Sequence, residues 1–90
     1  MYKIKYSAQI KKDIKTCQKR KCDFSLLEST IDKLRIPEPL NANNQEHNLK
    51  GSYIGYKECH IQPNWLLIYR YKGDFLELYR TGTHSDLFRK

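Results

Sequence analysis

The stretch from Lys57 to Gly82, KECHIQPNWLLIYRYKGDFLELYRTG, decides the fold. Short runs of apolar and β-prone residues alternate in it with turn residues, which are a proline after the first run and Lys-Gly-Asp after the second. Because tight turns join the runs, they predict an antiparallel meander of strands. The predicted strands are Lys57 to Gln62, Asn64 to Tyr71 and Phe75 to Thr81.

The residues that precede this stretch extend the same sheet. Residues 51–56 are typical of a fourth strand, whereas residues 40–49, rich in Asn and Gln, have no apolar period and predict a loop that carries His47. Apolar residues alternate with lysines over residues 1–7, which predicts a first strand. We expect this strand at an edge of the sheet or next to the last strand.

Two amphipathic helices are predicted between the first strand and the loop. Lysines fill the outer side of the first helix, and the second begins at Asp23 or Ser25 and stops before Pro37 and Pro39. The fold class is therefore α+β, with an N-terminal strand, a helical hairpin and a four-stranded antiparallel meander in one domain, residues 1–90. The apolar stripes are Tyr6, Ile10, Ile14 and Cys17, then Phe24, Leu27, Ile31 and Leu34.

Composition narrows the class of protein and the partners it can have. The 90 residues support one modest core, and 17 Lys and Arg against 10 Asp and Glu give a net charge of +7. Such a charge attracts nucleic acid, although it can also serve solubility alone. The three cysteines form no CxxC pair, and the longest apolar run, 65–69, is too short for a bilayer. We therefore expect a soluble cytoplasmic protein with reduced thiols.

All three histidines, His47, His60 and His84, lie in the second half of the chain with Arg80 close by. Imidazole exchanges protons near neutrality, so three of them beside a guanidinium could handle a phosphodiester if they converge. Taken singly, a histidine in a loop is more often a solvated surface residue. Arg80 could likewise pair with an acidic neighbour, Glu58 or Glu77, on the surface.

Strand alternation gives a first estimate of which side chains share a face. In 57–62 it places Cys59 and Ile61 toward the core, and Glu58, His60 and Gln62 on the opposite, wetter face. In 75–81 it places Leu76, Leu78 and Arg80 on one face and Phe75, Glu77 and Tyr79 on the other. Gly82 permits a sharp turn, after which His84 can swing back over the sheet toward His60.

Other chemistries are less well supported by these residues. A metal site from the histidines and Cys59 lacks ligand pairs at zinc spacing, and Cys59 as a nucleophile sits on the buried parity. No glycine-rich phosphate loop is present. Trp65 and Tyr69 could be core residues, and Phe88 either docks the C-terminal tail or stacks on a base. Acid and base catalysis by histidine is therefore the chemistry that these residues support best.

Three runs carry a resemblance to a known family: HNLKG at 47–51, YKECHIQPNWLLIY at 56–69 and RTGTHSDLF at 80–88. Over nearly its whole length the chain resembles the YafQ branch of the RelE superfamily of bacterial toxins. The resemblance implies a toxin of a type II toxin–antitoxin pair, which cuts messenger RNA in the ribosomal A site without a metal or other cofactor. Its implied partner is an antitoxin, acidic and partly disordered when free.

The resemblance also implies roles for individual residues. His84 is the expected acid, His60 or His47 the expected base, and Arg80 with Lys50 the expected cations at the phosphate. Asn64, Trp65 and Phe88 are expected to contact the substrate. The family often has Asp where this chain has Asn64, so either that carboxylate only orients a neighbour, which an amide can also do, or this toxin is slower.

Two other functions are compatible with the same sequence. Some toxins of the superfamily bind DNA gyrase and cut nothing, although they lack the histidine set. A non-catalytic nucleic-acid-binding module would use the basic helix instead, with an affinity that falls steeply as salt rises.

Overall fold

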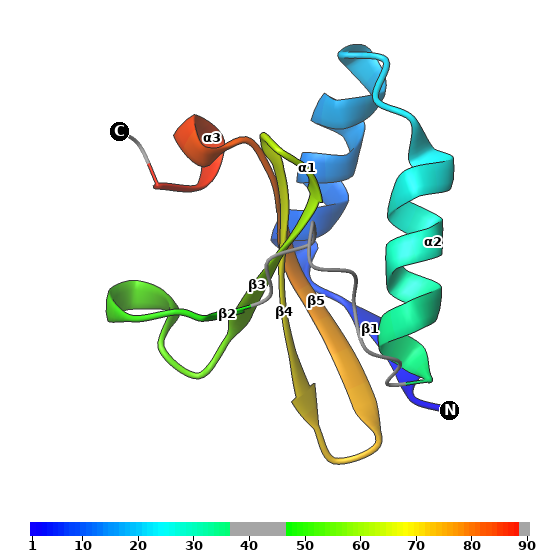
Figure 1. The fold of residues 1–90 in the computed structure, drawn as a ribbon, viewed down its shortest axis with the longest axis vertical. Coiled ribbons are helices and arrows are strands. Elements are labelled where there is room, and N and C mark those ends of the chain that lie inside the picture. The colour runs from blue at the N-terminus through cyan, green and yellow to red at the C-terminus, as the bar shows by residue number, and fades with distance from the viewer. Residues whose placement is uncertain (37–46, 89–90) are drawn as a thin grey trace.

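The protein forms a five-stranded sheet with the strand order β1-β5-β4-β3-β2 (Figure 1). The computed structural model describes residues 1–36 and 47–88. Strands β2 to β5 pair antiparallel, each with the next, which confirms the predicted meander over residues 57–82. The strands are β1 (Lys3–Tyr6), β2 (His47–Asn48), β3 (Lys57–Gln62), β4 (Trp65–Lys72) and β5 (Phe75–Gly82).

Two expectations about the sheet are wrong. The sheet is mixed, because β1 lies at the edge beside the last strand, as expected, but runs parallel to it. The segment expected as a fourth strand instead contains a 3-10 helix, η2 (Gly51–Tyr53), and the short strand β2 precedes it, in the predicted loop. Gly51 and Gly55 have φ values of 67° and 91°, a left-handed backbone that interrupts a strand. Residues 37–46, which include Pro37 and Pro39, lie outside the described residues.

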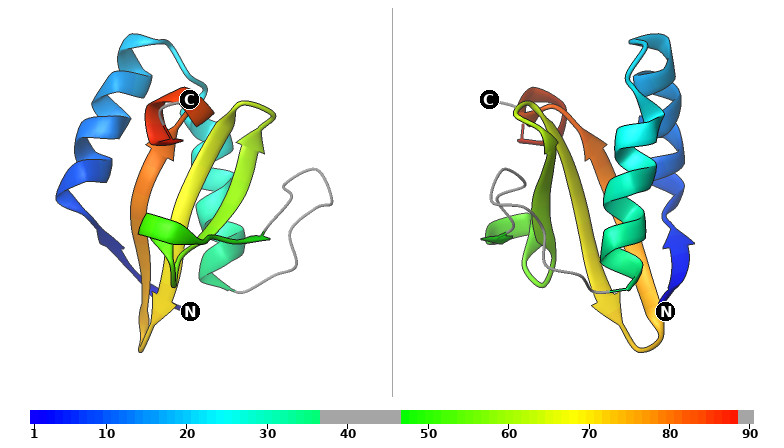
Figure 2. Two further views of the ribbon diagram at one scale, coloured as in Figure 1. Left: turned by 90° about the vertical axis from the view of Figure 1, so that its left-hand side faces the viewer. Right: turned by 45° about the vertical axis from the view of Figure 1, so that its right-hand side comes forward.

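The helices α1 (Ala8–Lys19) and α2 (Phe24–Arg35) cover one face of the sheet (Figures 1 and 2). Asp23 caps α2 by accepting a hydrogen bond from the backbone N–H of Ser25 at 3.0 Å. The predicted stripes pack against the sheet except for Tyr6, which belongs to β1 and is exposed. Within the described residues, no helix is both long and apolar enough to cross a membrane.

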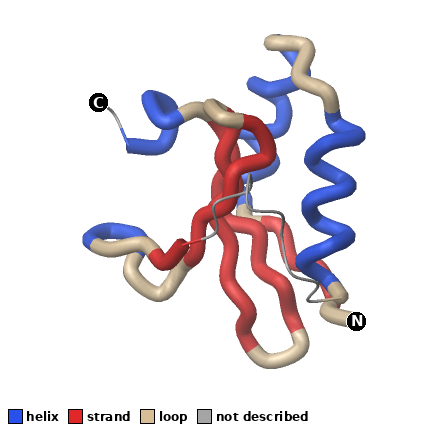
Figure 3. The backbone as a smooth tube through the Cα atoms, in the orientation of Figure 1, coloured by secondary structure: helices blue, strands red, loops and turns tan. Residues whose placement is uncertain are grey.

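Strand β4 is buried on both of its faces, which explains the unbroken apolar run at its start. Trp65, Leu67 and Tyr69 join the core under the two helices. Leu66 and Ile68 belong to a second, smaller cluster on the other face, covered by tyrosines from η2 and β5 and by α3 (His84–Phe88). Figure 3 shows η2 and α3 on the side of the sheet away from α1 and α2. We call this side the open face.

Two β-bulges overturn the simple alternation of faces. In β3 the register shifts between His60, which pairs with Leu66, and Gln62, which pairs with Trp65. Gln62 therefore shares a face with Trp65 and not with His60, contrary to the prediction. In β5 the register shifts between Leu78 and Arg80, which now pairs with Ile68 and turns to the open face instead of the face of Leu78.

Ser7 joins α1 to the sheet and gives a test of the fold. Its Oγ accepts a hydrogen bond from the Ile10 N–H at 2.9 Å, as an N-cap, and donates one to the Tyr79 carbonyl at 2.6 Å. Ser7→Ala should lower the free energy of unfolding by about 1–2 kcal/mol, because both contacts are lost. Urea unfolding measures this, with the exposed Ser29→Ala in α2 as control, expected within about 0.5 kcal/mol of wild type. Equal urea midpoints for the two variants would contradict the role of Ser7.

Candidate active site

His84 is held by Asn64 at the end of the sheet where α3 begins. The chain leaves β5 through Gly82, where an added Cβ would lie 2.9 Å from Asp86 Oδ2, so only glycine permits this close approach. Asn64, in the turn between β3 and β4, places its Oδ1 3.4 Å from the His84 backbone N and 3.0 Å from its Nδ1. Since a backbone N–H can only donate, the amide oxygen faces the histidine and Nδ1 carries a proton. The Nε2 atom is then the ring nitrogen available for chemistry.

His60 reaches the same place from β3. The rings of His60 and His84 lie 5.7 Å apart between centroids, at 86°, so the predicted approach of the two histidines is confirmed. The prediction of an exposed His60 is wrong, since its side chain is only 11% exposed. The cross-strand partner of His60 is Leu66, which belongs to the second core cluster, and this explains the burial of His60.

Glu58 is the residue of the site that the sequence reasoning missed. It was expected on a wet face, but it is 4% exposed, and its Oε1 lies 3.3 Å from His60 Nε2. The two side chains lie within hydrogen-bonding distance, so the Glu58 carboxylate fixes the orientation of the His60 ring. The spacing of two residues along one strand was the available signal, because it places Glu58 and His60 on one face.

His47 lies in the short strand β2 at the edge of the sheet. Its backbone pairs with Glu58 in the antiparallel register, which brings this strand beside the two other site residues of β3. The predicted loop location is wrong, and the role of His47 as a possible base stays a prediction.

Arg80 is paired, but with neither of the two predicted acids. Its Nε and Nη2 each donate to Asp13 of α1 at 3.1 Å, whereas Glu77 pairs with Arg70 and Lys5. The hydrogen bonds that Arg80 donates to Asp13, which is 8% exposed, raise the pKa of Arg80 further above its usual value. The guanidinium is thus permanently charged and held in one orientation, with its side chain 22% exposed.

Lys50 and Phe88 share an open groove of about 510 Å³ with Arg80 and Tyr53. The Phe88 ring is half-buried, packs edge-on against Tyr53 at 5.7 Å and lies 6.4 Å from the His84 ring. Phe88 therefore lies between His84 and the groove that Arg80 and Lys50 line together with Asp86. Of the two predicted roles, Phe88 does dock the end of the chain, and one side of it still faces the histidine.

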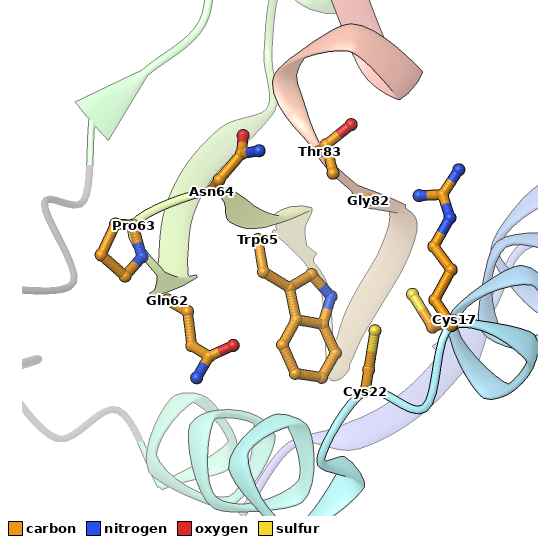
Figure 4. Close-up of a pocket in the computed structure, with 9 residues that line it drawn as sticks. Cys17, Cys22, Gln62, Pro63, Asn64, Trp65, Gly82 and Thr83 are labelled. Carbon is orange, nitrogen blue, oxygen red and sulfur yellow. The ribbon is translucent and has the colours of Figure 1, made fainter.

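Trp65 lies in the core and not on the open face. It is 5% exposed, its Nε1 donates to Thr81 Oγ1 at 2.9 Å, and its ring packs edge-on against Phe24 of α2. It also lines a second cavity with Asn64 and the thiols of Cys17 and Cys22 (Figure 4). Its burial favours a packing role, and its contact with a substrate stays a prediction.

The residues Glu58, His60 and His84 could also hold a metal ion, because one ligand atom from each lies within 4.8 Å of the others. Two imidazoles and a carboxylate are a ligand set that zinc and copper accept. The same three groups also form an acid–base set, with two imidazoles close together, a carboxylate beside one of them and fixed cations nearby. Proton transfer to and from a phosphodiester is what this arrangement can do chemically.

Comparison with known proteins shows which family the chain is similar to. The model of the family described as "Bacterial toxin of type II toxin-antitoxin system, YafQ" matches residues 2–89. The mRNA interferase toxin YafQ of Escherichia coli K12 is 42% identical over 86 residues, 94% of each chain.

Solved structures are similar over the same length. The YafQ toxin in the E. coli DinJ–YafQ complex is 41% identical, with a TM-score of 0.87 over 97% of both chains. A copper-bound mutant toxin from Helicobacter pylori is 40% identical, with a TM-score of 0.93 over 98% of this chain and all of the other.

The contact with Asn64 predicts the tautomer of His84. In its neutral form the ring should carry its proton on Nδ1, with Nε2 unprotonated, which two-bond ¹⁵N–¹H NMR spectra distinguish directly. Asn64→Ala should lose this preference for the Nδ1 proton. Asn64→Gln keeps the amide on a longer side chain and so tests whether the position of the amide oxygen matters. A neutral His84 protonated on Nε2 in the wild type would contradict the geometry.

Proposed function

The chain belongs to the YafQ family of bacterial toxins of type II toxin–antitoxin systems, and we propose that it cuts messenger RNA on the ribosome by histidine acid–base catalysis. In this proposal the 2′-hydroxyl of a ribose attacks the adjacent phosphorus and expels the 5′-oxygen of the next nucleotide, so no metal ion is needed. The observation that carries the proposal is the pair of imidazoles, 5.7 Å apart, one fixed by Asn64 and the other by Glu58.

His84 is the proposed acid. Asn64 occupies its Nδ1, so an imidazolium presents Nε2–H at an exposed position where a departing 5′-oxygen can receive the proton. Asn64 performs the orienting role with an uncharged oxygen, which supports the interpretation that a carboxylate at this position is an orienting group and not a base.

His60 is the proposed base, with His47 as the other candidate. When an imidazole takes the 2′-hydroxyl proton it becomes positive, and the Glu58 carboxylate 3.3 Å away stabilises that charge. The same carboxylate holds the ring in place while it is neutral. Glu58 therefore acts through His60, as a positioning residue.

Arg80 and Lys50 are the proposed cations for the phosphorane. Asp13 orients the Arg80 guanidinium in advance, so no reorganisation is required when charge develops on the phosphate oxygens. Because Asp13 also cancels the charge of Arg80 at long range, the exposed Lys50 contributes more to drawing the substrate in. Phe88, between this groove and His84, is the proposed stacking surface for a base.

The proposed macromolecular partners are the translating ribosome with its mRNA, met in the cytoplasm, and a cognate antitoxin. The E. coli relative has been solved in complex with DinJ, and a net charge of +7 suits an acidic partner that is partly disordered when free. Cleavage of mRNA on translating ribosomes in Mg²⁺ buffer, by toxin that has been stripped with EDTA and then desalted, separates this proposal from a gyrase-directed toxin and from a non-catalytic binding module, which form no RNA product.

The variants of His84 and Asn64 test the mechanism quantitatively. His84→Ala should lower the single-turnover cleavage rate at least about a hundredfold, because a positioned acid contributes roughly 10² to 10⁴. Asn64→Asp should stay within about threefold of wild type, since an oxygen acceptor is retained, while Asn64→Ala should lose about tenfold or more. Products ending in a 2′,3′-cyclic phosphate are expected. A wild-type cleavage rate from a folded His84→Ala variant would remove His84 from the mechanism. An equal loss of rate in Asn64→Asp and Asn64→Ala would contradict the orienting role of Asn64.

The metal-ligating character of the site predicts inhibition by soft divalent metals. Cu²⁺ or Zn²⁺ held by Glu58, His60 and His84 would occupy the nitrogen lone pairs that proton transfer requires. Added Cu²⁺ should therefore stop cleavage, and EDTA should restore the full rate, whereas Mg²⁺, which prefers oxygen ligands, should have no such effect. A rate that rises with Cu²⁺ or Zn²⁺ and falls with EDTA would contradict the metal-independent mechanism.

A further inference from the structure

Two of the three cysteines meet at the C-terminus of α1, away from the histidines. The helix ends in a Schellman motif, with Lys21 at φ 58° and hydrogen bonds from Lys21 N–H to Gln18 O and from Cys22 N–H to Cys17 O, both 3.1 Å. A contact between the side chains at these two positions frequently accompanies this motif, and here the Cys17 and Cys22 thiols are hydrogen-bonded. The local backbone therefore brings two thiols together.

The two thiols differ in exposure. Cys17 is 3% exposed and Cys22 is half-buried, and both are free. Burial first, and then the hydrogen bond with the Cys22 thiol, raise the pKa of Cys17 to about 12. Both sulfurs face an apolar cavity of about 360 Å³ that Trp65 and Asn64 also line, and Figure 4 shows them turned toward one another. The third cysteine, Cys59, lies fully buried in β3.

Arg20, between the two cysteines, connects this turn to the helix of His84. Its Nη1 and Nη2 donate to the Asp86 carboxylate at 2.6 and 3.2 Å. Asp86 in turn accepts from the Thr83 backbone N–H at 3.0 Å, one residue before His84. The bonds from Arg20, followed by those from Thr83, lower the pKa of Asp86 to about 2, so this connection is ionised at any ordinary pH.

We propose that Cys17 and Cys22 are a redox-active dithiol whose oxidation to a disulfide is transmitted, through Arg20 and Asp86, to the helix that carries His84. The oxidant is a hydroperoxide. The formation of the disulfide is independent of the proposed function, while its effect on RNA cleavage rests on that function.

The chemistry proceeds in two balanced steps. The more exposed sulfur, Cys22, attacks the peroxide O–O bond and becomes a sulfenic acid, with one water released from hydrogen peroxide. The Cys17 sulfur then attacks the Cys22 sulfur, and the departing hydroxide leaves as a second water with the Cys17 proton. Two thiols lose two hydrogens and two electrons, and one peroxide is reduced to two waters.

One property of the reduced pair favours this change, and the geometry of the disulfide gives the change its effect on Arg20. A thiol with a raised pKa gains little stability from ionisation, so its reduced form is not favoured over the disulfide. A disulfide also holds its sulfurs only about 2.05 Å apart, closer than two hydrogen-bonded thiols. In the proposal this shortening tightens the turn on oxidation and moves Arg20 relative to Asp86.

The first part of the test is chemical. Hydrogen peroxide or diamide should lower the mass of the whole chain by about 2 Da, for two hydrogens, and peptide mapping should find Cys17 linked to Cys22. Cys59 is the internal control and should still alkylate after unfolding. Cys22→Ala, at a half-buried position, should show no mass loss. A sulfinic acid, a dimer linked between chains or a disulfide through Cys59 would overturn the proposal.

The second part tests the transmission. Oxidation should shift the ring signals of His84 in NMR spectra and lower RNA cleavage about tenfold, because small displacements of a catalytic group have effects of this size. Dithiothreitol should reverse both changes. Arg20→Gln should still form the disulfide, while its His84 signals and its rate no longer respond. If the disulfide forms in wild type and the His84 signals stay in place, transmission is wrong. If the protein cleaves no RNA at all, the proposed function is wrong. The shift of the His84 NMR signals on oxidation then still tests the transmission from the disulfide.

Discussion

The structure depends on the burial of β4 on both faces. Trp65, Leu67 and Tyr69 pack under the helices while Leu66 and Ile68 pack under η2 and α3, so the central strand has no face left for polar chemistry. In a chain of 90 residues this two-sided core uses much of the apolar content. The reactive groups must then come from the ends of neighbouring strands and from the segments that follow them. Asn64, Arg80 and His84 all lie at such positions.

The same constraint explains how far sequence reasoning could go. The turns at Pro63 and Gly73 and the apolar run of β4 are local signals, and the hairpins β3–β4 and β4–β5 followed from them. The parallel direction of β1 depends on how α1 and α2 return the chain to the sheet, which no local pattern records. The short strand at His47 has only two residues, too few for any periodicity.

The bulges set the limit on predicting the site. Alternation placed Arg80 with Leu78, and the register shift in β5 turned it to the open face, where Lys50 and Phe88 lie. A bulge is a property of two paired strands, so one strand read alone cannot reveal it. The approach of His84 to His60 was predictable because it required only a glycine turn at Gly82 and the parity of β3 before its bulge. The buried partners Asp13 and Glu58 were missed because their burial is decided by tertiary packing.

The charge of the site follows from which acids accompany its bases. Glu58 faces His60, and Asp13 faces Arg80. The guanidinium of Arg80 and the imidazole of His60 therefore each have one carboxylate as a partner. His84 is different, because its partner Asn64 orients the ring without adding a negative charge. A phosphodiester approaching His84 therefore meets one carboxylate fewer than it would with Asp at this position, which lowers electrostatic repulsion. In the proposed mechanism the negative charge beside His84 comes from the substrate phosphate and from Glu58, whose carboxylate lies within 4.8 Å of the site nitrogens, and not from the residue at position 64.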